Sequence, residues 1–136
     1  MIIIDSSAII AILRDEPQAA APAARIAAEP GGERRMSVAS YLEVGAVLAG
    51  RSANDRLQVI PDLDGFLSDI GVTLDPVDED QARIALRARI EHGRGMGHGG
   101  PLNFGDCFSY ALAKTRNAPL LYVGNDFVAT DIVSAL

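Results

Sequence analysis

The sequence is poor in the residues that build disulfides and soft-metal sites. It holds one cysteine, Cys107, two histidines and no tryptophan among 136 residues. A single cysteine cannot form an internal disulfide, and together with two histidines it cannot supply the four ligands of a structural zinc site. Any metal site must therefore be built from oxygen ligands, and we expect Cys107 to lie in the core.

Two further absences concern surfaces. No stretch approaches the roughly 20 uncharged apolar residues of a membrane helix, and the N-terminus lacks the basic segment and apolar run of a secretion signal. The sequence therefore predicts a cytoplasmic protein without membrane contact. Acidic residues outnumber basic ones, 18 to 12, giving a net charge of −6. This excludes a protein that coats nucleic acid with a broad positive surface, so any such contact must be local.

Apolar side chains are abundant, at 49% of residues, which is enough for a proper core in one domain over residues 1–136. Short β-branched segments alternate with segments of helical periodicity. The expected strands are 1–4, 35–38, 72–74 and 120–123, and the expected helices are 6–13, 19–29, 41–49, 55–70, 78–92 and 104–115. This alternation predicts an α/β fold of three layers, with a central, mostly parallel sheet of four to five strands between helices.

Some details of the helices are also predicted. Pro61 and Gly65 divide the segment 55–70 into two pieces. In the helix over 78–92, the apolar spacing places four side chains against the core: Ala82, Ala85, Leu86 and Ile90. The segment 127–136 forms a short terminal element.

An acid directly follows the first expected strand. In parallel α/β sheets, ligands bind at the carboxyl ends of strands where the strand order reverses, which makes Asp5 a candidate functional residue. The alternative is that Asp5 only caps the next helix, although Ser6 and Ser7 are also suited to that role. A carboxylate buried beside an apolar strand is costly unless something compensates its charge.

Two more acids stand near helix starts. Glu43 follows Ser40 by three positions, which is the spacing of a capping box, and Asp106 follows Asn103 in the same way. Each acid alone fits a cap and a functional role equally well. Helix starts gather near the carboxyl ends of strands in this architecture, so both acids can face Asp5.

Three converging carboxylates would repel one another unless a cation neutralised them. Mg²⁺ and Mn²⁺ prefer hard oxygen ligands, and Mg²⁺ keeps several water molecules, which leaves room for a phosphate and an attacking water. The pattern therefore favours metal-dependent hydrolysis of phosphodiesters.

Four ordered motifs carry a resemblance to a known family. They are Ile-Ile-Ile-Asp-Ser-Ser-Ala at 2–8, Ala-Ser-Tyr-Leu-Glu at 39–43, Leu-Asn-Phe-Gly-Asp-Cys-Phe-Ser-Tyr-Ala-Leu-Ala-Lys at 102–114, and Pro-Leu-Leu-Tyr-Val-Gly-Asn-Asp-Phe-Val-Ala-Thr-Asp at 119–131. With them the chain resembles PIN-domain ribonucleases of the VapC type, the toxins of bacterial toxin–antitoxin pairs. The resemblance implies RNA cleavage, a cognate antitoxin and a homodimer.

The resemblance also implies the ligand set. Asp5, Glu43 and Asp106 would hold Mg²⁺, or Mn²⁺ in its place, with the Ser7 hydroxyl as a further contact. Many members of the family carry Thr-x-Asp before the last phenylalanine, whereas this chain reads Val-Gly-Asn-Asp-Phe at 123–127. We choose Asp126 as the fourth acid, and the competitors are Asn125 and Asp131.

A two-metal mechanism follows as an expectation. One ion between Asp5 and Asp106 would lower the pKa of a bound water, which Glu43 would orient or deprotonate. A second ion near Asp106 and Asp126 would stabilise the leaving oxygen.

Other signals are weaker. Basic residues could rim the site or be ordinary solvated charges, with Glu79 pairing with Arg83: Arg83, Arg87, Arg89, Arg94, His98, Lys114 and Arg116. The glycines of 95–100 match a dinucleotide-binding string, but that motif needs a strand before it and a helix after it, and Pro101 follows here. We interpret them as a flexible loop at the active site.

Two alternatives compete with the nuclease. A phosphoaspartyl phosphatase of the haloacid-dehalogenase type needs a second aspartate where Ser7 stands, and a receiver domain needs adjacent acids and a late lysine. A PIN-like scaffold without metal, acting only through protein partners, would have no reason to keep Asp5, Glu43 and Asp106 together.

Overall fold

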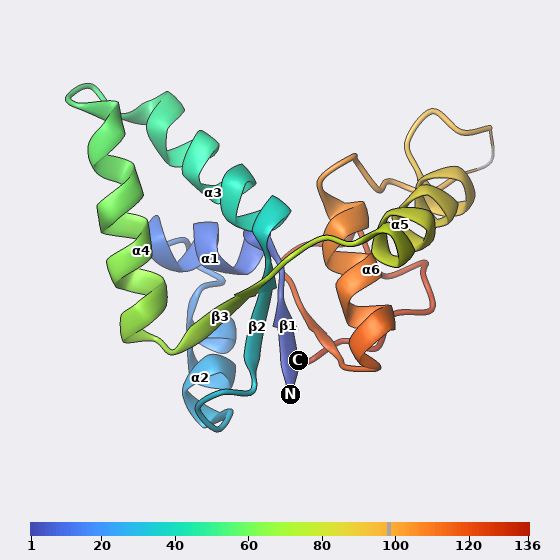
Figure 1. Cartoon of the computed structure of the whole chain (residues 1–136), viewed down its shortest axis with the longest axis horizontal. Helices are drawn as coiled ribbons and strands as arrows, with labels where there is room; N and C mark the ends of the chain where they lie inside the picture. The colour runs from blue at the N-terminus through green and yellow to red at the C-terminus, as the bar shows by residue number, and fades with distance from the viewer. Residues whose placement is uncertain (98) are drawn as a thin grey trace.

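The computed structural model describes residues 1–97 and 99–136, so the expectation for His98 lies outside the described residues. Four strands form one parallel sheet in the order β3-β2-β1-β4 (Figure 1). They are β1 (Ile2–Ile4), β2 (Arg34–Ser37), β3 (Val72–Asp75) and β4 (Leu120–Leu121). The helices are α1 (Ser6–Leu13), α2 (Ala20–Ala28), α3 (Val38–Arg51), the 3-10 turn η1 (Arg56–Gln58), α4 (Val59–Asp69), α5 (Glu79–His92) and α6 (Asp106–Arg116).

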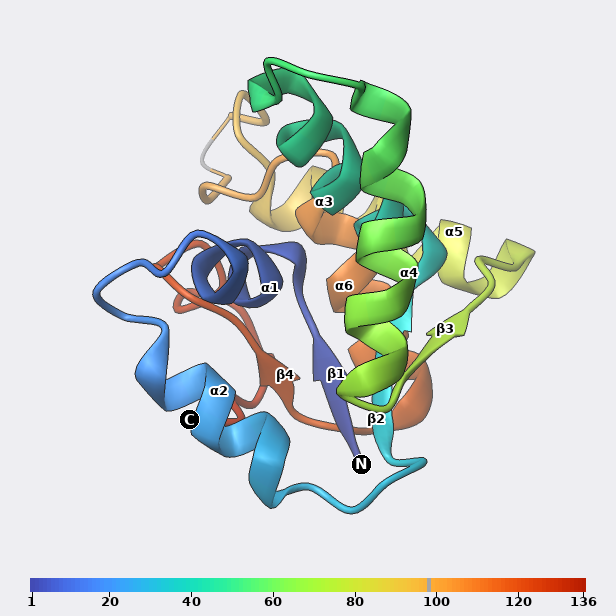
Figure 2. The ribbon, with the colours of Figure 1, turned by 90° about the vertical axis from the view of Figure 1, so that its left-hand side faces the viewer.

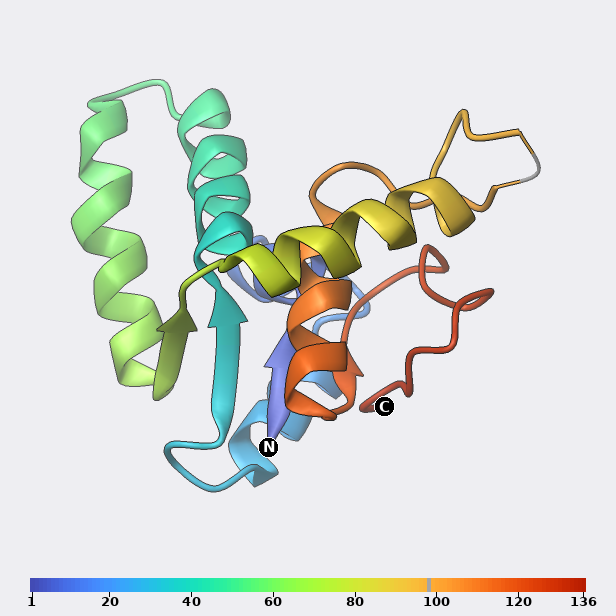
Figure 3. The same cartoon turned by 45° about the vertical axis from the view of Figure 1, so that its right-hand side comes forward.

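Helices cover both faces of the sheet because successive strand residues point to opposite sides. Ile3 of β1 packs in a core cluster with residues of α5 and α6, whereas Ile2 and Ile4 pack with α1 to α4. All three isoleucines are fully buried. Figure 3 shows α5 crossing over α6 on one side of the sheet, and Figure 2 shows α3 and α4 as a pair on the other. The three-layer α/β prediction is confirmed.

The strand order reverses beside β1. The chain passes from β1 to β2 and β3 on one side, and β4 then pairs with the other side of β1. The backbone N–H of Asp5 donates to the carbonyl of Leu121 (2.9 Å), so the ends of β1 and β4 lie side by side. Asp5 therefore stands at the switch point, as the sequence predicted.

The cap of α3 differs from the prediction, whereas the capping pattern before α6 agrees with it. Ser37, not Ser40, caps α3, because its Oγ accepts the N–H of Ala39 (3.2 Å). The expected capping box of Ser40 and Glu43 is therefore wrong, and Glu43 is free for another role. At α6, Asn103 Oδ1 accepts the N–H of Asp106 and Asp106 Oδ2 accepts the N–H of Asn103, both at 2.9 Å. This reciprocal pair keeps the expected capping pattern just before the helix.

The segment 55–70 is divided, but at a different residue. The 3-10 turn η1 passes into α4 at Val59. Pro61 lies in the first turn of α4, where its missing N–H costs no intrahelical hydrogen bond. Gly65 lies inside the helix and does not break it.

The predicted inward face of α5 is wrong except at Ala85. Leu86 and Ile90 are 61% and 56% exposed, and Ala82 is exposed as well. The buried residues are Gln81, Ala85 and Ala88. Small side chains let α5 lie close against α6, and this tertiary packing overrides the apolar periodicity of the sequence.

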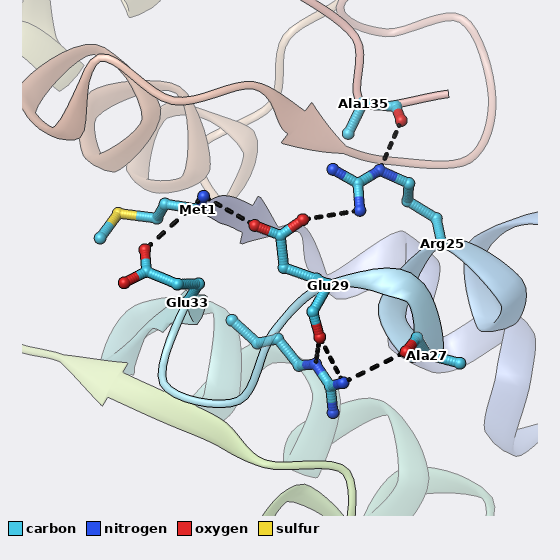
Figure 4. A network of polar contacts seen from close by, with 7 residues as sticks. Met1, Arg25, Ala27, Glu29, Glu33 and Ala135 are labelled. Atoms are coloured by element: carbon cyan, nitrogen blue, oxygen red, sulfur yellow. Dashed lines mark hydrogen bonds and ion pairs between the residues drawn. The ribbon is translucent and has the colours of Figure 1, made fainter.

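A network of ion pairs lies at the amino end of the sheet (Figure 4). The Met1 ammonium lies 2.6 Å from Glu29 Oε1, and Arg25 Nη1 lies 2.7 Å from Glu29 Oε2. These partners lower the pKa of Glu29, the Met1 hydrogen bond being the largest cause. Arg25 Nε also donates to the carbonyl of Ala135 (3.1 Å), which ties the C-terminal segment to α2.

The segment after β4 contains no helix. Its residues form turns, and Ser134 makes a parallel bridge to Leu120. None of the helices in the described residues combines the length and the apolar character needed to span a membrane.

Candidate active site

Acids from four separate segments line one pocket of about 500 Å³ at the carboxyl end of the sheet. Asp5 follows β1, Glu43 lies on α3, Asp106 begins α6, and Asp126 lies in the turn after β4. The structure therefore places all four predicted site residues around one pocket, which we call the acidic pocket. Glu16 also lines it, and sequence reasoning missed this fifth acid. Glu16 pairs with Arg14 at 3.2 Å.

Asp5 is 2% exposed, and both of its carboxylate oxygens accept hydrogen bonds. Oδ2 accepts the N–H of Ser7 (3.0 Å) and its hydroxyl (2.6 Å), and Oδ1 accepts the hydroxyl of Ser109 (2.6 Å). Asp5 is therefore also the cap of α1. The two interpretations of Asp5 do not exclude each other, since capping fixes the carboxylate at the pocket.

Further hydroxyls hold these groups in place. The hydroxyls of Ser40 and Ser109 lie 3.0 Å apart, and the Ser7 hydroxyl accepts the N–H of Val123 (3.0 Å). Ser7 thus links the end of β1 to the segment after β4. Sequence reasoning predicted a contact for Ser7 but missed Ser40 and Ser109. The available signal for Ser109 was its position one helical turn after Asp106 on an otherwise apolar stretch.

Glu43 is fixed by contacts on two sides. The Ser6 hydroxyl donates to Glu43 Oε1. On the other side the carboxylate lies so close to Gly105 that any Cβ atom at position 105 would overlap it. Burial is the main cause that raises the pKa of Glu43, and the charge of Asp5 raises it further, while the Ser6 hydrogen bond lowers it.

Asp106 is 5% exposed and has the most perturbed titration in the pocket. The pKa of Asp106 is raised to about 7, and burial is the main cause. The hydrogen bond from the Asn103 amide acts in the other direction and lowers the pKa. The charges of Asp5, Asp126 and Glu43 raise it further. Asp5, Asp126 and Glu43 therefore lie close enough for their charges to act on Asp106.

The two competitors for the fourth acid lie elsewhere. Asp131 pairs with Lys114 (2.8 Å) and accepts a hydrogen bond from the Tyr110 hydroxyl (2.7 Å), and these two contacts lower the pKa of Asp131, Lys114 being the larger cause. Neither Asp131 nor Asn125 lines the acidic pocket, whereas Asp126 does.

The donor set fits a hard divalent cation. The residues that line the acidic pocket include five carboxylates and no lysine, arginine or histidine within the described chain. Mutual repulsion and raised pKa values are the expected state of such acids without a cation. Within residues 1–97 and 99–136, no three acids, histidines or cysteines stand close enough to hold a metal unaided. Binding therefore requires inward movement of side chains or water ligands, which Mg²⁺ retains.

The weaker sequence signals have structural roles. Four of the basic residues form ion pairs: Arg83 with Glu79, Arg87 with Glu91, Lys114 with Asp131, and Arg116 with Asp75. Cys107 is 3% exposed, and burial raises its pKa to about 11, so its place in the core is confirmed.

Backbone hydrogen bonds join the two ends of the glycine-rich segment. Arg94 donates its N–H to the carbonyl of Leu102 (2.9 Å), and Leu102 donates to that of His92 (3.1 Å). A Cβ at Gly99 would collide with the carbonyl of Gly93. None of the described residues of 93–100 lines the acidic pocket.

The chain belongs to the PIN-domain family, whose sequence profile matches residues 2–133. Within that family its relatives are VapC proteins. Ribonuclease VapC28 of Mycobacterium tuberculosis is 50% identical over 134 residues, which cover 98% of this chain and 97% of the relative. Ribonuclease VapC of Mycolicibacterium smegmatis is 43% identical over 132 residues, covering 97% and 98%.

Solved structures show the same fold. The crystal structure of Mycobacterium tuberculosis VapC20, described as a sarcin–ricin loop cleaving toxin, has a TM-score of 0.75 at 17% identity and covers 98% of this chain and 97% of its own. A toxin–antitoxin complex from Klebsiella pneumoniae has a TM-score of 0.72 at 15% identity and covers 100% and 98%. At these identities the likeness concerns the fold.

Proposed function

We propose that the protein is a Mg²⁺- or Mn²⁺-dependent endoribonuclease, and that it is the toxin of a toxin–antitoxin pair in the cytoplasm. One observation carries the proposal: carboxylates of Asp5, Glu43, Asp106 and Asp126 surround one pocket whose described lining supplies no cation. The names of the full-length relatives support RNA as the substrate. Residues 1–136 would act as one domain.

Asp5, Asp106 and Asp126 would hold the metal, with Glu43 beside it. A divalent cation bound there supplies positive charge for the carboxylates and a Lewis acid for the scissile phosphate. The chain itself orients the ligands: Ser7 and Ser109 fix both oxygens of Asp5, and Asn103 fixes one oxygen of Asp106. The second oxygen of Asp106 is left for the cation.

Glu43 is the proposed general base. Its Oε1 is engaged by Ser6, which leaves Oε2 to accept a proton from the attacking water. The water oxygen then bonds to phosphorus, the bond from phosphorus to the leaving ribose oxygen breaks, and that oxygen takes up a proton from solvent water. Burial raises the pKa of Glu43 and so makes it a stronger base than an exposed glutamate.

The test is cleavage of end-labelled single-stranded RNA by the purified chain in Mg²⁺, in Mn²⁺ and in excess chelator. We expect internal cuts with either metal, none with chelator, and none from Asp5→Ala. Asp131→Asn is the matched control, because Asp131 pairs with Lys114 outside the pocket. Cleavage that survives chelation, or that persists in Asp5→Ala, would rule out the mechanism.

An antitoxin is the proposed partner, since the structural neighbours include toxin–antitoxin complexes. A groove of about 320 Å³ between α3 and α4 offers an apolar docking surface with almost no charge. Leu57 is 74% and Leu42 is 69% exposed beside it. We expect Leu57→Asp to weaken inhibition by the cognate antitoxin while RNA cleavage stays unchanged. Unchanged inhibition would place the antitoxin elsewhere. Homodimerisation stays a prediction.

A further inference from the structure

A second cleft adjoins the acidic pocket. It has a volume of about 520 Å³ and lies between the start of α2, the segment after β4 and the C-terminal segment. Gln18, Val123 and Gly124 line both this cleft and the acidic pocket. The two hollows therefore form one continuous surface, and we call the second the neutral cleft.

The lining of the neutral cleft differs in charge from that of the acidic pocket. No charged side chain belongs to its described lining, whereas five carboxylates line its neighbour. Tyr122, Gln18, Ser134 and Leu136 are among the residues that line it, and the first three carry groups that can form hydrogen bonds. An uncharged, flat group with hydrogen-bonding edges fits such walls, whereas a phosphate finds no positive charge there.

The walls are held in place by the fold. The C-terminal segment is hydrogen-bonded to β4 through Leu120 N–H to Val133 O and Ala135 N–H to Leu120 O, both at 2.9 Å. Arg25 ties the same segment to α2 (Figure 4). The Tyr122 ring packs against Phe127 with centroids 5.0 Å apart. Gly124 has φ +98° and open space where a side chain would stand, which keeps the passage between the hollows clear.

We propose that the neutral cleft binds the nucleoside that flanks the scissile phosphate of a single-stranded RNA substrate. The inference rests on the proposed ribonuclease function and assigns part of its substrate recognition. When the scissile phosphate lies beside the carboxylates of the acidic pocket, the base next to it lies outside that pocket. The neutral cleft is the adjoining hollow, because Gln18 and Gly124 line both. Hydrogen bonds to the base edges are a usual means of binding single-stranded RNA, and Gln18 and Ser134 carry groups that can form them.

Binding is tested first without catalysis. The ¹⁵N-labelled full chain, in chelator, is titrated with adenosine, guanosine, cytidine and uridine separately, and amide shifts are recorded by NMR. We expect shifts at Gln18, Ala21, Gly124 and Ser134 for at least one nucleoside. Ala21→Trp fills the cleft from the exposed start of α2 and should abolish them. Ala24→Trp is the matched control, because Ala24 is exposed on the same helix outside the cleft.

Kinetics with an RNA oligonucleotide and Mn²⁺ form the second test. Ala21→Trp should raise KM by about tenfold, the loss of one bound base, with kcat within about twofold of the unmodified chain. Ala24→Trp should change neither. Nucleoside shifts centred on the groove between α3 and α4, or an unchanged KM in Ala21→Trp, would overturn the assignment.

The outcomes separate this inference from the proposed function. Nucleoside binding in the cleft without any RNA cleavage would remove the ribonuclease and leave the binding site. RNA cleavage that Ala21→Trp does not affect would leave the ribonuclease and remove the subsite. If Ala21→Trp weakened only the antitoxin complex, the cleft would be a peptide site and the nucleoside assignment would be wrong.

Discussion

Asp5 and Asp75 both lie at the carboxyl end of a strand, on β1 and β3, which β2 separates, and only one of them belongs to a site. Asp5 follows β1 and Asp75 ends β3, and they are 2% and 3% exposed. Asp75 pairs with Arg35 at 3.0 Å and with Arg116 at 2.8 Å. Among residues 1–97 and 99–136, the groups that donate hydrogen bonds to the Asp5 carboxylate are neutral groups of Ser7 and Ser109. A carboxylate at the end of a strand therefore does not by itself identify a site.

The difference lies in the source of the compensating charge. A buried carboxylate is tolerated when a cation neutralises it, and the chain provides that cation for Asp75 and, at the amino end, for Glu29. In the described part of the chain, Glu16 of the acidic pocket pairs with Arg14, but no lysine, arginine or histidine lines the pocket beside the other four carboxylates. The charge that is missing there is the physical reason to expect a metal ion.

The largest expected effect follows from removing one charge of the acidic pocket. Asp106→Asn keeps an acceptor for the Asn103 amide but loses a metal ligand, so RNA cleavage should fall at least about 10³-fold, equivalent to about 4 kcal/mol. Mn²⁺ should raise the melting temperature of the unmodified chain more than that of the variant. Calorimetry with and without Mn²⁺, beside an RNA cleavage assay, checks both. Full activity in the variant would place the metal elsewhere.

The same variant isolates a pH dependence of the metal-free protein. Because burial raises the pKa of Asp106 to about 7, the folded state holds a proton that the unfolded state has already released between about pH 4 and 7. Its contribution to stability is therefore fully present below about pH 4 and is lost as the pH rises through 7, by up to about 4 kcal/mol.

Urea unfolding in chelator at several pH values measures this contribution. The difference in unfolding free energy between the unmodified chain and Asp106→Asn should favour the variant increasingly up to pH 7 and then level off. A difference that does not depend on pH would show that Asp106 titrates as an ordinary carboxyl group.

Asp75 should respond in the opposite way. Asp75→Asn leaves the charges of Arg35 and Arg116 without their buried partner, so the free energy of unfolding should fall by about 3 kcal/mol. The loss should be the same with and without Mn²⁺, as judged by urea unfolding in both conditions. If Asp75→Asn kept the free energy of unfolding of the unmodified chain but Mn²⁺ no longer stabilised it, Asp75 would belong to the metal site and the contrast with Asp5 would be wrong.

The sequence alone predicts those parts of the fold and site that depend on local pattern. The β-branched run before Asp5, the alternation of strands and helices, and the acids Asp5, Glu43 and Asp106 were found in this way, whereas Asp126 came from the family resemblance. What it missed depends on packing between distant segments. Leu86 and Ile90 face outward because α5 packs on α6 through Ala85 and Ala88.

Contacts between distant residues were missed for the same reason. Asp5 and Ser109 are 104 positions apart in the chain, and no local spacing reveals their hydrogen bond. The Asp75 ion pairs also join separate elements, with Arg35 on β2 and Arg116 on α6. Sequence pattern therefore found the acids, but it could not tell which buried carboxylate is compensated by the chain.

The smallest predicted effect concerns a residue that contributes no functional group. Gly105→Ala suits the backbone, which is helical there with φ −64° and ψ −41°, but the new Cβ would displace the Glu43 carboxylate. We expect RNA cleavage to fall by about tenfold, or roughly 1.4 kcal/mol, with little change in melting temperature. Gly65→Ala is the matched control, because its Cβ meets open space on α4 and should only stabilise the helix by about 0.5–1 kcal/mol.

A double variant decides whether Gly105 acts through Glu43. If its only role is to leave room for that carboxylate, Gly105→Ala should cause no further loss of cleavage in a Glu43→Ala background, because effects through one group do not add. Two independent losses that multiply would instead place Gly105 in contact with the RNA. In the first case the acidic pocket depends on two features. Four of its carboxylates lack a cationic partner in the described lining, and the backbone at Gly105 leaves space for the Glu43 carboxylate to reach the attacking water.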